Sequence, residues 1–200
     1  QLGTGHAVLQ AEGALDGFSG DVLVLYGDTP LLTPETLGRL LEARRGPANP
    51  AVAVLGFRPE DPGDYGRIVL APDGGVDRIV EARDADAETR AVRLCNSGVM
   101  AVDGRVLFDL LRRLGSDNAK GEYSLTDLVG LARADGRAAA VVEADPADLA
   151  GVNSRADLAA VEAVAQARLR ARAMAGGATL TDPDTVWLSA DTELGRDVTV

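Results

Sequence analysis

The chain has 200 residues, of which 46% are hydrophobic, and it carries a formal net charge of −11 with a pI of about 4.5. This length suits one domain of good size, or one domain with part of another, and the charge argues against non-specific binding to nucleic acid or to anionic membranes. A single cysteine excludes an internal disulfide framework and fits a reducing, cytoplasmic location. No apolar run approaches the roughly 20 residues that span a bilayer.

Within residues 1–15, the first predicted element is a helix through Ala7, Val8, Ala11 and Leu15, with Thr4 as its cap. Gly3 and Gly5 flank its start. A glycine-flanked helix N-terminus offers backbone N–H groups and a positive dipole end, which suit an anion. An ordinary helix cap is the alternative interpretation of the same residues.

Residues 22–28, which read VLVLYGD, form the central predicted strand. Their β-branched and leucine side chains are typical of a strand buried on both faces in a parallel sheet. The strand ends at Gly27-Asp28, because Pro30 cannot continue a central strand. Asp28 therefore falls at the carboxyl edge of a sheet, where α/β proteins bind ligands and where a carboxylate can hold a divalent cation. In the alternative, Asp28 only begins a turn.

Local signals define the elements that follow. Thr33 and Pro34 predict a helix start, and an apolar strand is expected over residues 51–57. Two short strands flank a Pro-Asp-Gly-Gly turn as a hairpin over residues 68–80, and Glu81 ends it.

A charged segment over residues 82–90 is expected to be a solvated loop, before another strand over residues 92–102. Asn96, Ser97 and Gly98 interrupt this strand. Polar residues and a glycine inside an apolar strand indicate either a bulge or a ligand that approaches the backbone.

The second half of the chain ends in a long helix. Before it, the pattern predicts a helix over 105–114, a loop over 116–123, a helix over 125–134 and a strand over 138–142. Ser154 caps the long helix, with Asp157 in the position of a capping box, and Gly176 and Gly177 end it.

The tail changes character after this helix. Leu188, Leu194 and Val200 recur every six residues, a spacing typical of the hexapeptide repeat of a β-helix solenoid. A pair of ordinary short strands is the alternative. Because the chain begins at Gln1 and stops within this repeat, we expect a fragment of a longer protein, and an upstream targeting signal stays open.

Seven short stretches occur in a particular order: QLGTGHA, LYGDTPL, YGRI, IVEARDA, CNSGVMA, NAKGEYSLTD and GVNSRADL. In this ordered set the chain resembles the bifunctional bacterial N-acetylglucosamine-1-phosphate uridyltransferase/glucosamine-1-phosphate acetyltransferase family. The resemblance implies an α/β, Rossmann-like nucleotidyltransferase domain with a mostly parallel sheet over residues 1–153. It further implies a linker helix over 154–175 and the start of a left-handed β-helix acetyltransferase domain over 176–200. The parent protein would be a homotrimer.

The resemblance also implies roles for individual residues. The implied substrate contacts are Gly3 and Thr4 at the nucleotide, Tyr26, Gly27 and Asp28 at the nucleotide end of the pocket, and Gly66, Glu81 and Asn96 at N-acetylglucosamine. Asp28 and Asn153 would be the catalytic pair, as the protein ligands of Mg²⁺.

The implied reaction is transfer of a uridylyl group from UTP to N-acetylglucosamine 1-phosphate, giving UDP-N-acetylglucosamine and pyrophosphate. The attacking phosphate oxygen is already ionised at neutral pH, so the reaction needs no general base. For that reason we expect a structural role for His6, the single histidine. Acetyl transfer to glucosamine 1-phosphate would belong to the chain beyond Val200. The alternatives are another sugar-1-phosphate nucleotidyltransferase and a non-catalytic scaffold that binds a sugar nucleotide or forms trimers.

The chain departs from the family in three places. The glycine-rich phosphate loop and a uracil-reading glutamine, which precede the QLGTGHA stretch in the family, do not occur here. Lys120 and Ser124 stand where glutamine and tyrosine are common, so they receive no catalytic role. We therefore expect this chain alone to be inactive and to trimerise weakly, since a solenoid needs about three repeats to be stable.

Overall fold

A computed structural model describes residues 2–200 of the chain. The chain divides into two compact units. The first contains the residues up to Gly27 together with Leu32–Leu149, and the second contains Asp28–Leu31 together with Ala150–Val200. The short segment Asp28–Leu31 therefore belongs with the C-terminal part of the chain, and not with its neighbours in sequence.

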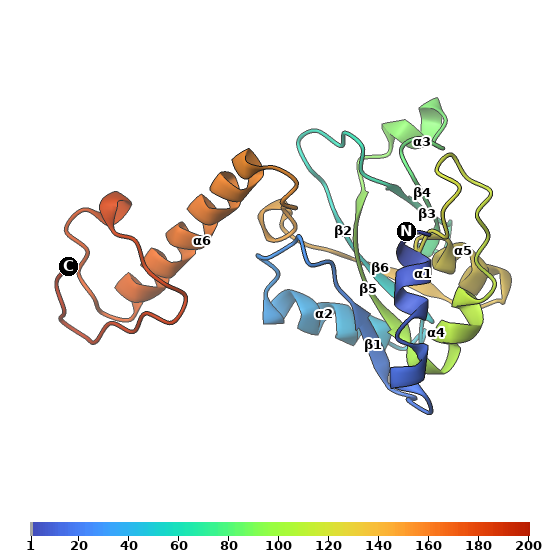
Figure 1. Ribbon diagram of the computed structural model, residues 1–200, viewed down its shortest axis with the longest axis horizontal. Coiled ribbons are helices and arrows are strands. Elements are labelled where there is room, and N and C mark those ends of the chain that lie inside the picture. The colour runs from blue at the N-terminus through green and yellow to red at the C-terminus, as the bar shows by residue number, and fades with distance from the viewer. Residues whose placement is uncertain (1) are drawn as a thin grey trace. The chain divides into compact units, whose positions relative to one another are not determined.

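The first unit combines one sheet with helices (Figure 1). Its strands are β1 (Asp21–Val24), β2 (Val52–Phe57), β3 (Arg67–Leu70), β4 (Val76–Val80), β5 (Cys95–Asp103) and β6 (Ala139–Glu143). Its helices are α1 (Thr4–Leu9), α2 (Pro34–Arg44), α3 (Ala87–Ala91), α4 (Gly104–Leu111) and α5 (Asp127–Ala134), with 3₁₀ turns at Glu12–Leu15 and Pro146–Asp148. The expected α/β class is thus confirmed for this unit.

The strands form a six-stranded sheet in the order β4-β3-β5-β2-β6, with β1 also paired to β5. Among the described strands of this sheet, β2 and β6 pair in parallel and the other pairs are antiparallel. The expectation of a mostly parallel sheet is therefore wrong. Short connections such as the turn between β3 and β4 allow only antiparallel neighbours, because a parallel pair needs a long crossover.

Strand β1 also differs from its prediction. Its residues are only partly buried, and among the described strands it pairs with β5 alone. Val22 of β1 and Val52 of β2 both face Val102, so the two strands flank β5 on opposite sides. Strand β3 pairs with β5 at Cys95, opposite β2, and so shares the β1 side. Between its pairings with β1 and with β3, strand β5 carries Asn96, Ser97 and Gly98.

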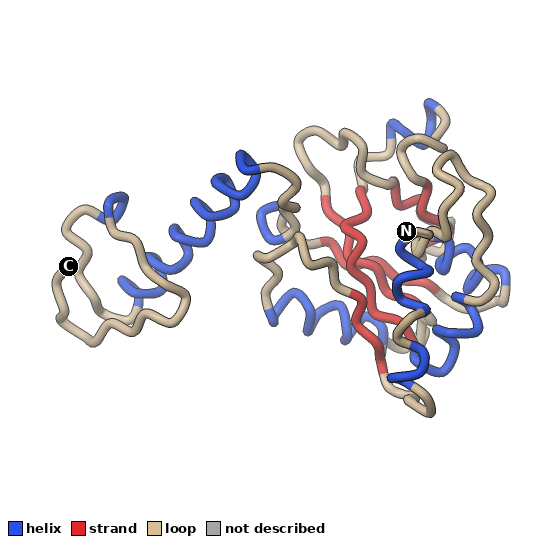
Figure 2. Tube along the Cα trace, in the orientation of Figure 1, coloured by secondary structure: helices blue, strands red, loops and turns tan. Residues whose placement is uncertain are grey.

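Helices cover both faces of the sheet (Figure 2). Along β2, Val52 and Val54 pack with α4 and α5, whereas Ala53 and Leu55 pack with α2. This alternation follows from the two-residue period of a strand. Leu40 of α2 is fully buried, and such a side chain contributes roughly 1.5–3 kcal/mol by leaving water. The sheet is therefore the middle layer between helices on both faces, and its packing fixes the positions of the strand ends.

Two local predictions at helix starts meet different outcomes. Thr33 caps α2 by accepting from the Thr36 N–H, as predicted. Thr4 does not cap α1, where Gly3 is the N-cap residue and makes no side-chain cap bond. The segment expected as a solvated loop ends in α3, whose start Asp86 caps.

The second unit is built on α6 (Arg155–Ala175). Ser154 and Asp157 form the predicted capping box, and Gly176 follows the last turn. The chain then makes a loop that includes a 3₁₀ turn at Pro183–Thr185, and Thr179 forms a parallel bridge with Thr199. None of the helices among the described residues combines the length and apolar character of a membrane span.

Candidate functional site

The stretch of β5 between its pairings with β1 and β3 carries a bulge. The register between β2 and β5 shifts between Val54 and Gly56, opposite Ser97, Gly98 and Val99. Ser97 Oγ donates to the Leu55 carbonyl at 2.7 Å, and Asn96 Oδ1 accepts from the Gly98 N–H at 3.2 Å. The predicted bulge is confirmed. It fixes the buried Asn96 side chain, whose amide nitrogen carries two further donors.

Tyr26 lies directly against this bulge. Gly98 has a φ of +86°, and a Cβ atom built there would stand 2.4 Å from a Tyr26 ring carbon. A side chain at this position would therefore be both strained and in collision with the ring. The structure thus places two of the predicted site residues, Tyr26 and Asn96, next to Gly98.

Gly66 and Glu81 lie at the ends of the neighbouring strands. The Asn96 N–H donates to the Gly66 carbonyl at 2.8 Å, which joins the residue before β3 to β5. Arg67 pairs with Val80, so Gly66 and Glu81 follow at the same end of β3 and β4. Because the order is β4-β3-β5, the three residues predicted to contact the sugar stand on adjacent strands at one end of the sheet.

The sequence analysis did not single out the residues that surround Glu81. Thr126 is buried and donates its hydroxyl to Glu81 Oε1 at 3.2 Å. Burial raises the pKa of the neighbouring Asp127, and the negative charges of Glu81 and Asp84 raise that pKa further. The signal for both residues was present, since they end the NAKGEYSLTD stretch that supported the resemblance.

Gly3 and Thr4 lie at the start of α1, beside the segment that precedes α5. The Tyr123 N–H donates to the Leu2 carbonyl and the Tyr123 carbonyl accepts from Gly5 N–H. Gly3 has a φ of +107°, and a Cβ atom there would stand 2.6 Å from the Tyr123 oxygen. Thr4 Oγ1 accepts from the Leu125 N–H at 3.0 Å. Both residues thus have a structural role, because they join the start of α1 to the segment before α5.

A hollow of about 350 Å³ borders the same contact between α1 and the segment before α5. Its lining residues are Leu2, Gly3, Thr4, His6, Ala7 and Glu122. Gly3 and Thr4 can therefore contact a ligand while they fasten the backbone. His6 is one of these lining residues, and its Nε2 lies 3.4 Å from Gln10 Nε2.

In the second unit, the structure brings Asp28 and Asn153 together. The Val152 N–H donates to the Asp28 carbonyl at 2.8 Å, so the residue before Asn153 is bonded to Asp28. Both candidate ligands are exposed. A carboxylate and an amide supply oxygen donors, which Mg²⁺ prefers, and few protein ligands suffice because Mg²⁺ keeps several of its waters. The two residues fit a magnesium ion in this respect.

A cluster of acidic or histidine ligands is not found. Within residues 2–200 no group of three or more His, Cys, Asp or Glu side chains could hold a metal ion. A pair made of one carboxylate and one amide is a different kind of site, so Asp28 and Asn153 remain the candidate.

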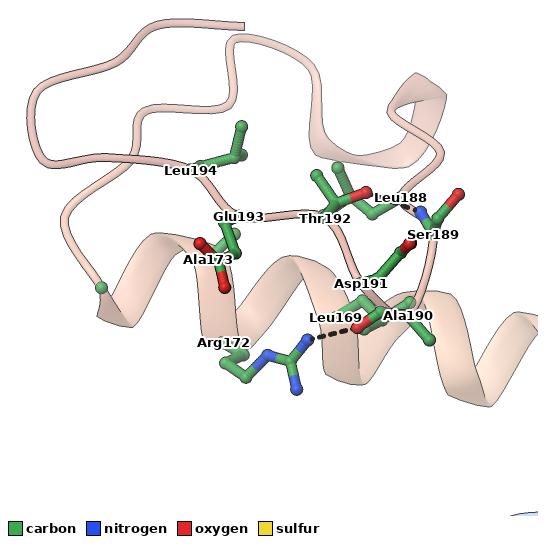
Figure 3. A pocket seen from close by; sticks show the side chains of 11 residues that line it. Leu169, Arg172, Ala173, Leu188, Ser189, Ala190, Asp191, Thr192, Glu193 and Leu194 are labelled. Atoms are coloured by element: carbon green, nitrogen blue, oxygen red, sulfur yellow. Dashed lines mark hydrogen bonds between the residues drawn. The ribbon is translucent and has the colours of Figure 1, made fainter.

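A second hollow of about 510 Å³ lies between α6 and residues 188–194 (Figure 3). Arg172 lies on its wall and donates to the Ala190 carbonyl at 3.3 Å. None of the predicted site residues lines this hollow, and we assign it no function.

Comparison with known proteins yields close relatives. No protein-family model matches the chain. The curated "Bifunctional protein GlmU" of Rhodospirillum rubrum is 66% identical over 198 residues, which are 99% of this chain and 44% of the relative. The proteins of the same name from Paramagnetospirillum magneticum and Rhizorhabdus wittichii are 61% and 57% identical over 200 residues, again with 44% of each relative covered.

These findings define the chain first by class, as an α/β chain whose predicted site residues gather at strand ends and whose relatives carry the name of a bifunctional protein. More particularly, the chain belongs to the GlmU family. It spans about 44% of the length of the curated relatives that it matches. The family resemblance found in the ordered sequence motifs is thus confirmed.

Proposed function

We propose that this chain carries the uridyltransferase part of an enzyme that makes UDP-N-acetylglucosamine and pyrophosphate from UTP and N-acetylglucosamine 1-phosphate. The observation that carries the proposal is the arrangement of Gly66, Glu81 and Asn96 on adjacent strands at one end of the sheet. Asparagine both donates and accepts hydrogen bonds, which suits an acetamido group. The identity to GlmU proteins over the whole chain supports the same assignment.

The nucleotide contacts in this proposal are Gly3, Thr4, Tyr26 and Gly27. Gly3 and Thr4 line a hollow, and Tyr26 packs beside Asn96 through Gly98. Gly27 has open space where a side chain would stand, so a ligand can approach its backbone.

The proposed Mg²⁺ ligands are Asp28 and Asn153. When bound, the ion would screen the repulsion between the two anionic substrates and stabilise charge at the α-phosphate. The attacking phosphate oxygen is already ionised, so the protein's remaining task is to position it in line with that phosphorus. Asp28 and Asn153 would hold their oxygens toward the shared ion, while Glu81 and Asn96 orient the sugar.

The proposal extends to the domain organisation. We assign residues 1–153 to the nucleotidyltransferase domain, 154–175 to the linker helix and 176–200 to the start of a left-handed β-helix. The parallel bridge between Thr179 and Thr199 supports the last assignment, because a solenoid coil returns to pair in parallel with its own start. A homotrimeric parent with acetyltransferase activity, its cytoplasmic location, and inactivity of this chain alone stay predictions.

The test is magnesium-dependent release of pyrophosphate from UTP and N-acetylglucosamine 1-phosphate, measured on the longer protein that contains this chain. We expect Asp28→Ala to lower kcat by at least about 100-fold, because a metal-held charge contributes several kcal/mol to the transition state. The matched control is Asp16→Ala, which removes an exposed carboxylate in the first unit and should leave turnover unchanged.

Two outcomes would count against the proposal. Near-normal turnover in Asp28→Ala would remove the metal assignment. A folded parent protein that releases pyrophosphate only with another nucleotide or sugar phosphate would change the substrate, and no release with any of them would favour a non-catalytic scaffold.

A further inference from the structure

The backbone of Asn153 is held by a residue of α6. Asp157 Oδ2 accepts from the Asn153 N–H at 3.1 Å and from the Ser154 N–H at 2.8 Å. In return, Ser154 Oγ accepts from the Asp157 N–H at 3.1 Å. An ordinary capping box needs only the two bonds between Ser154 and Asp157. The bond to Asn153 is additional, and it holds the backbone N–H of the residue whose side chain is a candidate ligand.

The segment that carries Asp28 is held at both of its ends. The Val152 N–H donates to the Asp28 carbonyl at 2.8 Å, one residue before Asn153. At the other end, Arg168 Nη1 donates to the Leu31 carbonyl at 3.1 Å. Arg168 lies on α6, like Asp157. The helix therefore anchors both of the short segments that carry the candidate ligands.

We propose that Asp157 and Arg168 are positioning residues for the metal site, Asp157 through the Asn153 backbone and Arg168 through the segment Asp28–Leu31. The inference rests on the proposed function only in taking Asp28 and Asn153 as the ligands. Neither positioning residue would itself be a ligand of the ion. They act on the geometry of the pair, because partners that orient metal ligands commonly change metal affinity by 10–100-fold when they are removed.

The test measures Mn²⁺ affinity, as a spectroscopic substitute for Mg²⁺, by electron paramagnetic resonance on the longer protein that contains this chain. We expect Asp157→Ala and Arg168→Gln each to raise the Mn²⁺ dissociation constant by about 10-fold. The same variants should need more Mg²⁺ for half-maximal pyrophosphate release, with kcat at saturating Mg²⁺ within about threefold of the unmodified protein. This separation indicates a weakened site rather than a lost one.

Each variant has a matched control on the same helix. Ser154→Ala removes the bond to the Asp157 N–H but keeps the bond from Asn153 to Asp157. Arg172→Gln removes a guanidinium that binds the Ala190 carbonyl instead of Leu31. Both controls should leave the Mn²⁺ dissociation constant within about twofold, although Ser154→Ala should lower the melting temperature as cap loss does.

The outcomes separate this inference from the proposed function. If Asp157→Ala melts like Ser154→Ala and binds Mn²⁺ as the unmodified protein does, Asp157 is only a helix cap and the inference is wrong. If Asp28→Ala itself leaves Mn²⁺ binding unchanged, the ligand assignment fails, and the positioning roles fail with it.

Discussion

At the scale of single residues, two glycines differ in the space that a Cβ atom would find. Gly98 and Gly136 both have a positive φ, of +86° and +73°. The space around them differs, because the Tyr26 ring occupies the Cβ position of Gly98 whereas nothing lies within 4 Å of that position at Gly136. The pair thus separates backbone strain from collision.

We expect Gly98→Ala to destabilise the protein by about 1–3 kcal/mol more than Gly136→Ala does. Both substitutions strain the backbone, by about 1 kcal/mol or more, but only the first displaces an aromatic ring from a packed contact. Urea unfolding of the two variants measures the difference. Equal losses would mean that Tyr26 moves away at no cost and does not define the site.

At the scale of elements, a network of ion pairs joins the C-terminal ends of α2 and β5 to the start of β1. Arg44 of α2 is 6% exposed, and its Nη2 lies 3.1 Å from Asp103 Oδ2. Its Nε lies 3.0 Å from Asp21 Oδ1 without forming a hydrogen bond. Arg45, the next residue, also pairs with Asp21 but is 65% exposed.

Arg44 and Arg45 therefore allow a controlled comparison between a buried and an exposed ion pair. Arg44→Met should cost about 3–5 kcal/mol, because it leaves two carboxylates without their buried partner. Arg45→Met should cost about 0–1 kcal/mol, since water screens an exposed pair. Chemical denaturation of both variants tests the contrast. Similar small losses would show that the buried network does not contribute to stability.

The same network predicts how stability responds to acid. Hydrogen bonds from Arg105 lower the pKa of Asp103, and the charge of Arg44 adds to them against the opposing effect of burial. An aspartate with a lowered folded pKa stabilises the protein fully above its unfolded pKa of about 3.9, and this contribution is lost as the pH falls toward the folded value. Stability should therefore decline below about pH 4, and in Asp103→Asn the decline should be shallower. A decline of equal steepness in the variant would place its cause elsewhere.

At the scale of the whole molecule, features set by neighbouring residues could be predicted from the sequence, whereas pairings between distant segments could not. The Ser154–Asp157 capping box, the Thr33 cap and the β3–β4 turn each depend on a few neighbouring residues, and all three are present. The mostly parallel sheet failed, because strand direction depends on partners far apart in sequence. Residues 22–28 have the composition of a central strand, yet β1 ends at Val24 and is only partly buried.

The candidate site was predicted in part for the same reason. The bulge at Gly98 was visible locally, as a glycine and polar residues inside an apolar strand. The proximity of Gly66, Glu81 and Asn96 was not, since it depends on the order of three strands, and only the family resemblance grouped them. Thr126 was missed because its contact with Glu81 joins the start of α5 to the end of β4.

The membership of Asp28–Leu31 in the second unit has a consequence for biosynthesis. The ribosome releases Asp28 long before Val152 and Arg168, whose bonds hold this segment in place. Domains generally begin to fold from the N-terminal side during synthesis, so most of the first unit can form while these four residues still lack their partners. The nascent chain would therefore gain the geometry of the proposed metal site late, when α6 emerges, and a chain stalled before that helix would have a sheet but not the proposed pair of ligands in place.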